Sequence, residues 1–229
     1  MKKREFAIAD IHGCCRTFQL LLEQIEFSKQ DTLYLLGDYI DRGPDSKGVI
    51  DFILELQSDG YHVRPLLGNH EDMLLQALQT AAGEHLAEWL KYGGRATLKS
   101  YGVDHPADIP KEHIDFMRSL SLFHCTGTHI LVHAGLNFCL EDPFSKEGEQ
   151  AMLQDRYQRS DRRKQQGRKL VVGHTIRHED EIMNSLTSDI ITLDNGCYMG
   201  ASAEGRGSLM ALELKSGKVF IQCNSESSY

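Results

Sequence analysis

Six residues of the sequence carry oxygen or imidazole donors that could bind metal ions. Each comes at or just after a short apolar run, and together they are Asp10, His12, Asp38, Asn69, His133 and His174. Mixed carboxylate, amide and imidazole ligands suit divalent first-row metals such as manganese, iron or zinc. Six ligands exceed what one open catalytic ion needs, but they fit two ions about 3.5–4 Å apart that share a carboxylate. The pattern predicts a two-metal site of the kind that activates water against phosphate esters.

The spacing of the ligands suggests how they divide between the two ions. Asp10 and His12 stand two positions apart, which sends both side chains to the same side of an extended chain. We therefore expect Asp10 and His12 on the first ion and Asp38 as the bridge. The second ion would be bound by the remaining three ligands, Asn69, His133 and His174.

The alternative is that these residues are ordinary core or surface side chains. The chain has 11 histidines, so chance pairs with Asp occur, and each motif taken alone is weak. Chance would have to place five such motifs at successive strand ends, so we favour the metal site. Small neighbours of the ligands, Gly37, Gly68 and Gly173, would let the backbone approach the cluster closely.

Short apolar runs alternate with helical patterns in the first half of the chain. The runs at 6–9, 33–36 and 61–67 predict strands, and apolar residues at helical spacing in 18–25 and 49–56 predict helices between them. Repeated strand–loop–helix units imply a doubly wound parallel sheet, in which sites form at the carboxyl ends of the strands. The candidate ligands follow those ends.

The remaining segments divide into a helical stretch and a second series of strands. Residues 73–121 predict helices that form a cap inserted beside the site. Apolar runs that end at His133, at His174 and before Asp194 predict strands, and 208–222 predicts a hairpin. Residues 141–168 are polar and predict a loop with one helical segment.

Length and charge narrow the class of protein. The 229 residues suggest one domain, 1–229, with insertions, and a net charge of −8 argues against nucleic acid as the main partner. The six cysteines match neither a zinc pattern nor a disulfide scaffold, so we expect free thiols and a cytoplasmic location. No apolar run predicts a signal peptide or a membrane span.

The motifs resemble the signature of the phosphoprotein phosphatase family of binuclear metallophosphoesterases. That family has blocks of the form GDxHG, GDxxDRG and GNHE, and here they read ADIHG at 9–13, GDYIDRG at 37–43 and GNHE at 68–71. Later blocks match at 133–135 and 173–175, and only Ala9 departs from the usual Gly. The resemblance spans residues 5 to about 214. It implies an α/β, calcineurin-like β-sandwich of two mixed sheets flanked by helices, which differs from the doubly wound sheet expected from the pattern alone.

The resemblance also implies roles for residues outside the ligand set. His70 matches the general acid, Asp41 its carboxylate partner and Arg42 a phosphate clamp. Arg156 matches a second clamp of bacterial and phage-type members, although the neighbouring arginines of 159–163 leave a solvated role open. The implied mechanism is direct in-line attack by a bridging hydroxide, with two divalent ions, manganese favoured over iron or zinc.

Two substrates fit this machinery. Residues 91–102 resemble the NGGxxT segment of bacterial-type serine/threonine protein phosphatases, which favours a phosphorylated protein or peptide as partner. The sequence does not identify the oligomeric state, and a monomer is favoured. The alternative is a symmetrical bis(5'-nucleosyl)-tetraphosphate hydrolase acting on a dinucleoside polyphosphate. A non-catalytic metal-binding regulator is disfavoured, because it would need neither an acid such as His70 nor a clamp such as Arg42.

Overall fold

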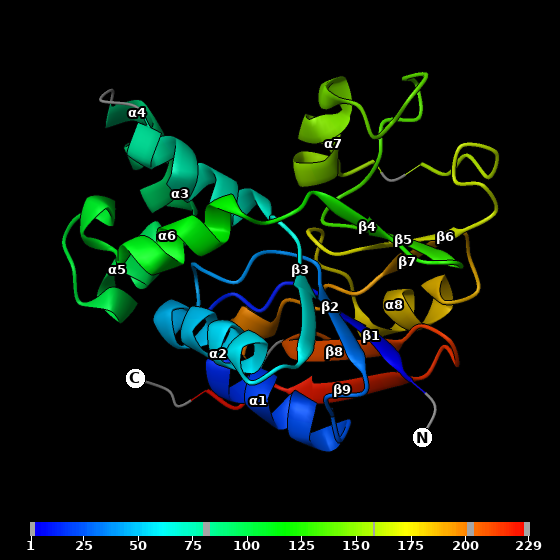
Figure 1. Cartoon of the computed structure of the whole chain (residues 1–229), viewed down its shortest axis with the longest axis horizontal. Helices are drawn as coiled ribbons and strands as arrows, with labels where there is room; N and C mark the ends of the chain where they lie inside the picture. The colour runs from blue at the N-terminus through cyan, green and yellow to red at the C-terminus, as the bar shows by residue number, and fades with distance from the viewer. Residues whose placement is uncertain (1–2, 80–82, 158, 201–203, 227–229) are drawn as a thin grey trace.

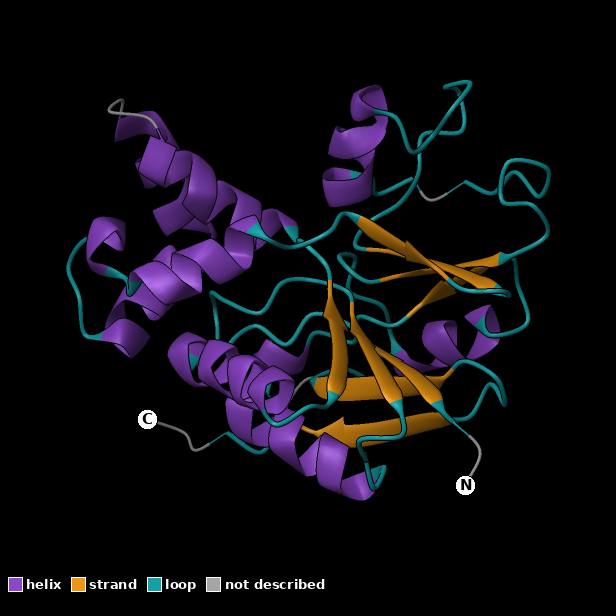
Figure 2. Cartoon of the chain, viewed as in Figure 1, coloured by secondary structure: helices purple, strands orange, loops and turns teal. Residues whose placement is uncertain are grey.

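The computed structural model describes residues 3–79, 83–157, 159–200 and 204–226, and its strands form two mixed sheets (Figures 1 and 2). The first sheet has the strand order β3-β2-β1-β8-β9. Its strands are β1 (Glu5–Ile8), β2 (Thr32–Leu35), β3 (His62–Pro65), β8 (Ser208–Glu213) and β9 (Val219–Cys223). β1, β2 and β3 run parallel, whereas β8 pairs antiparallel with β1 and with β9.

The second sheet has the order β4-β5-β6-β7 and faces the first. It comprises β4 (Phe123–Cys125), β5 (His129–Val132), β6 (Lys169–Val172) and β7 (Ile190–Thr192). β5, β6 and β7 are parallel, and β4 joins β5 antiparallel. The calcineurin-like sandwich of two mixed sheets is therefore confirmed, and the single doubly wound sheet expected from the pattern alone is wrong.

The side chains of each strand alternate between the two faces of its sheet, which explains why the apolar runs of the sequence led to the wrong sheet arrangement. In β1, Phe6 and Ile8 pack in the layer that contains α1 and α2, while Ala7 packs in the layer between the sheets. In the second sheet, Leu131 and Val171 join Ala7 between the sheets. Both faces of these strands are apolar, as they also are in a doubly wound sheet, so the pattern does not reveal what covers each face.

Helices cover the outer faces of the sandwich. α1 (Cys15–Gln24) and α2 (Ser46–Ser58) lie on the first sheet, and the range 73–121 is mostly helical as predicted. The helices of that region are α3 (Asn69–Gln79), α4 (Gly83–Trp89), the π-helical turn η1 (Leu90–Gly94), α5 (Arg95–Tyr101) and α6 (Lys111–Arg118). Its status as an insertion within a single domain stays a prediction.

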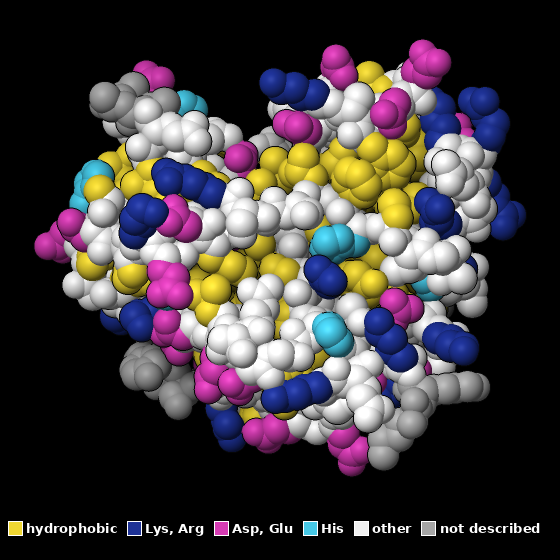
Figure 3. All heavy atoms as spheres, viewed as in Figure 1, with side chains coloured by type: hydrophobic (Ala, Val, Ile, Leu, Met, Phe, Trp, Pro, Cys, Tyr) yellow, Lys and Arg dark blue, Asp and Glu magenta, His cyan; other side chains and the backbone are white. Residues whose placement is uncertain are grey.

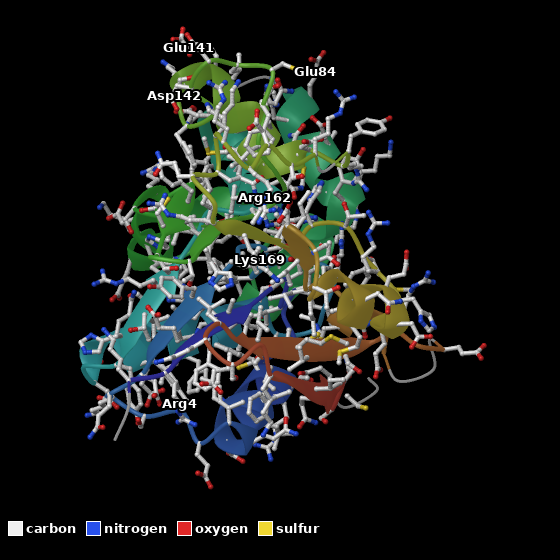
Figure 4. All side chains as sticks on the ribbon, turned by 90° about the vertical axis from the view of Figure 1, so that its right-hand side faces the viewer. Arg4, Glu84, Glu141, Asp142, Arg162 and Lys169 are labelled. Atoms are coloured by element: carbon white, nitrogen blue, oxygen red, sulfur yellow. The ribbon has the colours of Figure 1, made fainter. Side chains whose placement is uncertain are left out.

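The elements that were not predicted from the sequence include β4, α8 (Glu179–Ser185) and the short 3-10 turn η4 (Cys197–Met199). The helical segment expected within 141–168 is α7 (Glu149–Gln154). Glu84 of α4 and Asp142 of the loop before α7 lie at the same end of the molecule (Figure 4). Thus the helices around α4 and the loop before α7 rise on one side of the two sheets.

The surface carries both signs of charge. In Figure 3, acidic and basic side chains are both scattered over the visible face, and several Lys and Arg side chains lie at its upper right edge, where Figure 1 draws the chain between α7 and β6. No helix in the described part of the chain combines the length and apolarity that crossing a bilayer demands.

Candidate metal centre

Five of the six candidate ligands lie in loops at the carboxyl ends of strands from both sheets, and Asn69 is the first residue of α3. Asp10 and His12 follow β1, Asp38 follows β2, His133 follows β5 and His174 follows β6. Four of them have backbone in the left-handed region, as do two further residues of the site; these φ angles are Asp10 42°, His12 45°, Asp38 54°, Asp41 71°, Arg42 68° and His174 65°. Such strain clusters at functional sites, where the surrounding structure enforces it.

Asp38 lies at the middle of the site. Its Oδ2 is 3.5 Å from His12 Nε2, and its Oδ1 is 3.5 Å from His133 Nε2. Two groups of donor atoms that could each hold an ion share this carboxylate: Asp38 with His12 and His70, and Asp38 with His133 and His174. The arrangement fits the expected bridge.

Asn69, His133 and His174 converge on one side of Asp38. Asn69 Oδ1 lies 2.9 Å from both His133 Nε2 and His174 Nδ1, and the two imidazole nitrogens are 3.2 Å apart. Since His133 Nδ1 donates to Leu36 O at 2.8 Å, its Nε2 offers a lone pair. Burial lowers the pKa of His133, and it lowers that of His174 to about 3, so both imidazoles are in the neutral form that ligates metals. The donor set therefore fits a divalent cation.

His12 and Asp10 lie on the other side of Asp38 but differ in orientation. His12 Nδ1 donates to Ile40 O at 2.8 Å, which turns Nε2 toward Asp38. The Asp10 carboxylate falls outside both groups and accepts the backbone N–H of His174 at 2.9 Å. Burial, followed by the charges of Asp194 and Asp38, raises the pKa of Asp10 well above its usual value. The structure brings five expected ligands together and places the sixth at their edge.

Close approach of backbone to ligands explains the neighbouring glycines. A Cβ at Gly68 would lie 2.2 Å from Asp38 Oδ1, and one at Gly173 would lie 2.0 Å from Asp10 Oδ1. A Cβ at Gly37 would lie 2.9 Å from His133 Nδ1. The expectation that small residues are needed beside the ligands is confirmed.

His70 and Asp41 form a buried pair beside the ligands. His70 Nδ1 donates to Asp41 Oδ2 at 2.7 Å, and the side chains are 1% and 0% exposed. Burial acts to lower the pKa of His70, but Asp38 and the bonded Asp41 raise it by more, so the net shift is upward. His70 Nε2 faces the site, 3.9 Å from Asp38 Oδ2. The pair can therefore hold a proton at the edge of the metal centre.

The helical region supplies the support for Asp41, which the sequence analysis missed. Trp89 Nε1 donates to Asp41 Oδ2 at 3.0 Å, and Thr97 Oγ1 donates to Asp41 Oδ1 at 2.6 Å. Gly93 O accepts the backbone N–H of Arg42 at 3.4 Å. Residues of the segment 91–102 thus hold Asp41 and Arg42 in place, so the presence of this segment is weaker evidence for a phosphoprotein substrate. A buried Trp usually finds a hydrogen-bond partner for its indole N–H. Trp89 is the single Trp of the sequence, and its need for such a partner was the only signal that could have pointed to this bond.

Glu71 is a second residue whose role was missed, although it belongs to the GNHE block. Its two oxygens accept four backbone N–H groups, from Gly68 at 3.1 Å, Asp38 at 2.9 Å, Tyr39 at 2.8 Å and Ile40 at 3.2 Å. Burial and the charge of Asp38 raise its pKa to about 8, against the effect of these donors. Glu71 ties the loop after β2 to the loop after β3.

The two arginines expected to act as phosphate clamps differ in placement. Arg42 Nη1 donates to His12 Nε2 at 2.9 Å, and its guanidinium lies 4.8 Å from the centroid of the Tyr198 ring. Arg156 is exposed beyond the end of α7, and its charge contributes to lowering the pKa of His174, after burial and His133. Arg42 is thus part of the centre, and Arg156 acts on it from the rim.

The fold and this centre define a class of protein. The profile of the calcineurin-like phosphoesterase family matches residues 6–197. The chain therefore belongs to the calcineurin-like phosphoesterase family.

Among curated relatives, the symmetrical bis(5'-nucleosyl)-tetraphosphatase of Nitrosomonas europaea is 35% identical over 158 residues, which cover 67% of this chain and 54% of that protein. The chain spans about half the length of the curated relatives it matches. A solved structure of a provisionally named diadenosine tetraphosphatase has a TM-score of 0.62 at 20% identity, over 98% of this chain and 95% of that one. The cold-active protein-tyrosine phosphatase of a psychrophilic Shewanella also has a TM-score of 0.62, at 16% identity, over 97% and 81% of the two chains. Both structures share the fold.

Proposed function

We propose that the chain hydrolyses dinucleoside tetraphosphates symmetrically, to two nucleoside diphosphates. The central position of Asp38 between two donor groups carries the proposal of a two-ion phosphoesterase. The curated relatives support the tetraphosphate over the phosphorylated protein that we first favoured. Manganese, a cytoplasmic location and a monomer stay predictions.

In the proposed reaction, two divalent ions would be held by Asp38 together with Asp10 and His12 on one side and Asn69, His133 and His174 on the other. When bound, they would lower the pKa of a coordinated water and draw charge from phosphoryl oxygens.

The chain's own residues would do the rest of the chemistry. Water attacks an inner phosphorus, the central P–O–P bond breaks, and the departing diphosphate oxygen takes a proton. His70 is placed to supply that proton from Nε2 because Asp41 holds Nδ1. Arg42 would offset charge on the phosphoryl oxygens with its planar fork of donors. Arg156 could do the same from the rim.

The deciding assay offers the metal-reconstituted protein bis(5'-adenosyl) tetraphosphate in parallel with phosphoserine, phosphothreonine and phosphotyrosine peptides. We expect preference for the tetraphosphate, with ADP as the sole nucleotide product by chromatography. A preference for a phosphopeptide would favour protein phosphatase activity instead. A mixture of ATP and AMP as products would exclude symmetrical cleavage. Activity that survives complete chelation would exclude the metal mechanism.

His70 needs a separate test because it shares a donor group with His12 and Asp38. We expect His70→Asn to lower kcat by about 10²- to 10⁴-fold, the usual contribution of a general acid, with two ions per chain retained. Loss of an ion by elemental analysis would make His70 a ligand instead.

A further inference from the structure

A groove of about 830 Å³ opens beside the metal centre. Its walls come from the start of α1, the loop after β2, α5, and the segments around residues 198–200 and 224–226. Figure 1 draws α1, α2, α5 and the last described residues on the same side of the molecule. The volume lies within the range of small-ligand pockets, about 300–1,000 Å³.

Three cations line this groove. Arg42 belongs to both sites, since it donates to His12 in the metal centre and lies in the groove wall. Arg16 and Lys99 line the groove further along and are exposed. Across the ranges that the structure describes, neither Arg16 nor Lys99 has a carboxylate within ion-pair distance. The groove therefore offers unpaired positive charge that continues outward from Arg42.

The two carboxylates in the groove wall are engaged elsewhere. Asp45 accepts the backbone N–H of Gly48 at 2.9 Å and so caps the start of α2. Glu226 accepts Thr17 N and Oγ1, both at 2.9 Å, at the start of α1. Helix N-termini stabilise negative charge, which partly offsets these two carboxylates. The groove lining thus holds three cations against two carboxylates whose charge is partly offset.

Tyr198 fixes the inner end of the groove. Its ring meets the His12 imidazole edge-on, with centroids 5.2 Å apart, and the Arg42 guanidinium stacks on it at 4.8 Å. Tyr198 therefore positions Arg42 between the ligand His12 and the open groove.

We propose that this groove binds one nucleoside diphosphate half of the substrate, a site that rests on the proposed function. Arg42 binds the phosphate nearest the metal centre, and Arg16 and Lys99 bind the outer phosphate and the nucleoside beyond it. A single phosphate on a protein side chain would occupy the Arg42 end alone, whereas a diphosphate arm uses all three cations. The groove thus favours a polyphosphate.

The test reverses two charges that lie outside the metal centre. The double variant Arg16→Glu/Lys99→Glu is compared with Arg64→Glu/Lys215→Glu, which makes the same charge change at exposed sites outside the groove. Each is assayed on bis(5'-adenosyl) tetraphosphate and on p-nitrophenyl phosphate, which has no second phosphate to bind Arg16 and Lys99. We expect the groove variant to lower kcat/KM for the tetraphosphate at least about tenfold more than for the small ester, mainly through KM, and the control to change both alike.

Calorimetric titration of the metal-loaded protein with ADP separates the two proposals. Weaker ADP binding by the groove variant than by the control supports the groove even if wild-type protein leaves the tetraphosphate intact, a result that would exclude the proposed function alone. Equal ADP binding and equal kinetics in the two double variants would overturn the groove.

Discussion

Replacing Asp41 by Asn tests whether the buried carboxylate tunes the acid. The amide keeps the shape of the side chain and can still accept from Thr97 or Trp89, but it removes the negative charge beside His70 Nδ1. The raised pKa of His70 depends in part on that charge. A general acid must be protonated, so kcat should fall as pH rises through the raised pKa of His70. In the variant the pKa of His70 is lower, so this alkaline loss of kcat should begin at a lower pH than in the wild type.

The size of the shift follows from the contact. A hydrogen bond to a charged group contributes about 1.5–3 kcal/mol, and a pKa unit corresponds to about 1.4 kcal/mol. The 2.7 Å bond between His70 and Asp41 is fully buried, so the whole range applies without solvent screening. We expect the alkaline limb of the kcat profile to move to lower pH by about one to two units. At pH values above the pKa of His70 in both proteins, kcat of the variant should be about 10- to 100-fold lower than that of the wild type.

The assay is a pH profile of kcat for the metal-saturated wild type and for Asp41→Asn, with bound metal measured at each end of the range. Thr97→Val serves as the matched control, because it removes a neutral donor to Asp41 and leaves the charge in place. Its limb should move less. A uniform loss of kcat at every pH, with the limb unmoved, would refute the assignment of Asp41 as the residue that tunes His70.

Three further predictions test the framework of the site. At about pH 9, above the pKa of about 8 at which Glu71 ionises, Glu71→Gln should lower the free energy of urea unfolding by about 3 kcal/mol, because the amide NH2 group must face backbone N–H groups that donate to Glu71; a change below about 0.5 kcal/mol would contradict this. Gly173→Ala should reduce bound metal in elemental analysis, because its Cβ would meet Asp10 Oδ1 at 2.0 Å, whereas Gly127→Ala, with open space, should not. Burial raises the pKa of Asp31, but bonds from Arg4 and Ser28 lower it by more, so its net stabilisation holds above the unfolded pKa of about 3.9 and disappears as pH falls through the lower folded value. Arg4→Ala should therefore cost about 1 kcal/mol at pH 7 and progressively less in acid unfolding curves; an equal cost at pH 2 would refute the linkage.

The sequence was most informative where chemistry and strand ends coincide. Asp38 and His133 each directly follow an apolar run, and parallel strands place their carboxyl ends at one edge of a sheet, so short-range spacing predicted that both side chains lie at strand ends. Spacing did not predict that these two strand ends belong to different sheets that face each other. The two-sheet sandwich came from the family resemblance, because the pattern of apolar runs could not show that β8 turns antiparallel beside β1.

The missing parts depend on contacts between distant segments. Trp89 and Thr97 bond to Asp41 across 48 and 56 positions, and no local pattern marks such pairs. The substrate was harder to predict from the sequence than the site, since the proposed groove is assembled from α1, α5 and residues 224–226, which are far apart in the chain. The segment 91–102 suggested a protein phosphatase, but its Thr97 and Gly93 are used to hold the loop of Asp41 and Arg42.

The strain in the loop after β2 gives those supports their importance. Asp38, Asp41 and Arg42 all have positive φ, at a cost of about 1–3 kcal/mol each, so the loop keeps this shape only while its neighbours enforce it. Glu71 fixes its first half through backbone N–H groups, and the helical region fixes its second half through Thr97 and the carbonyl of Gly93. One loop thus carries Asp38, Asp41 and Arg42, the residues proposed as the bridging carboxylate, the partner of the acid and the phosphate clamp. Since Trp89 of α4 and Thr97 of α5 both bond to Asp41, we expect a movement of either helix to displace this loop and so to change the proposed metal binding, proton transfer and phosphate binding together.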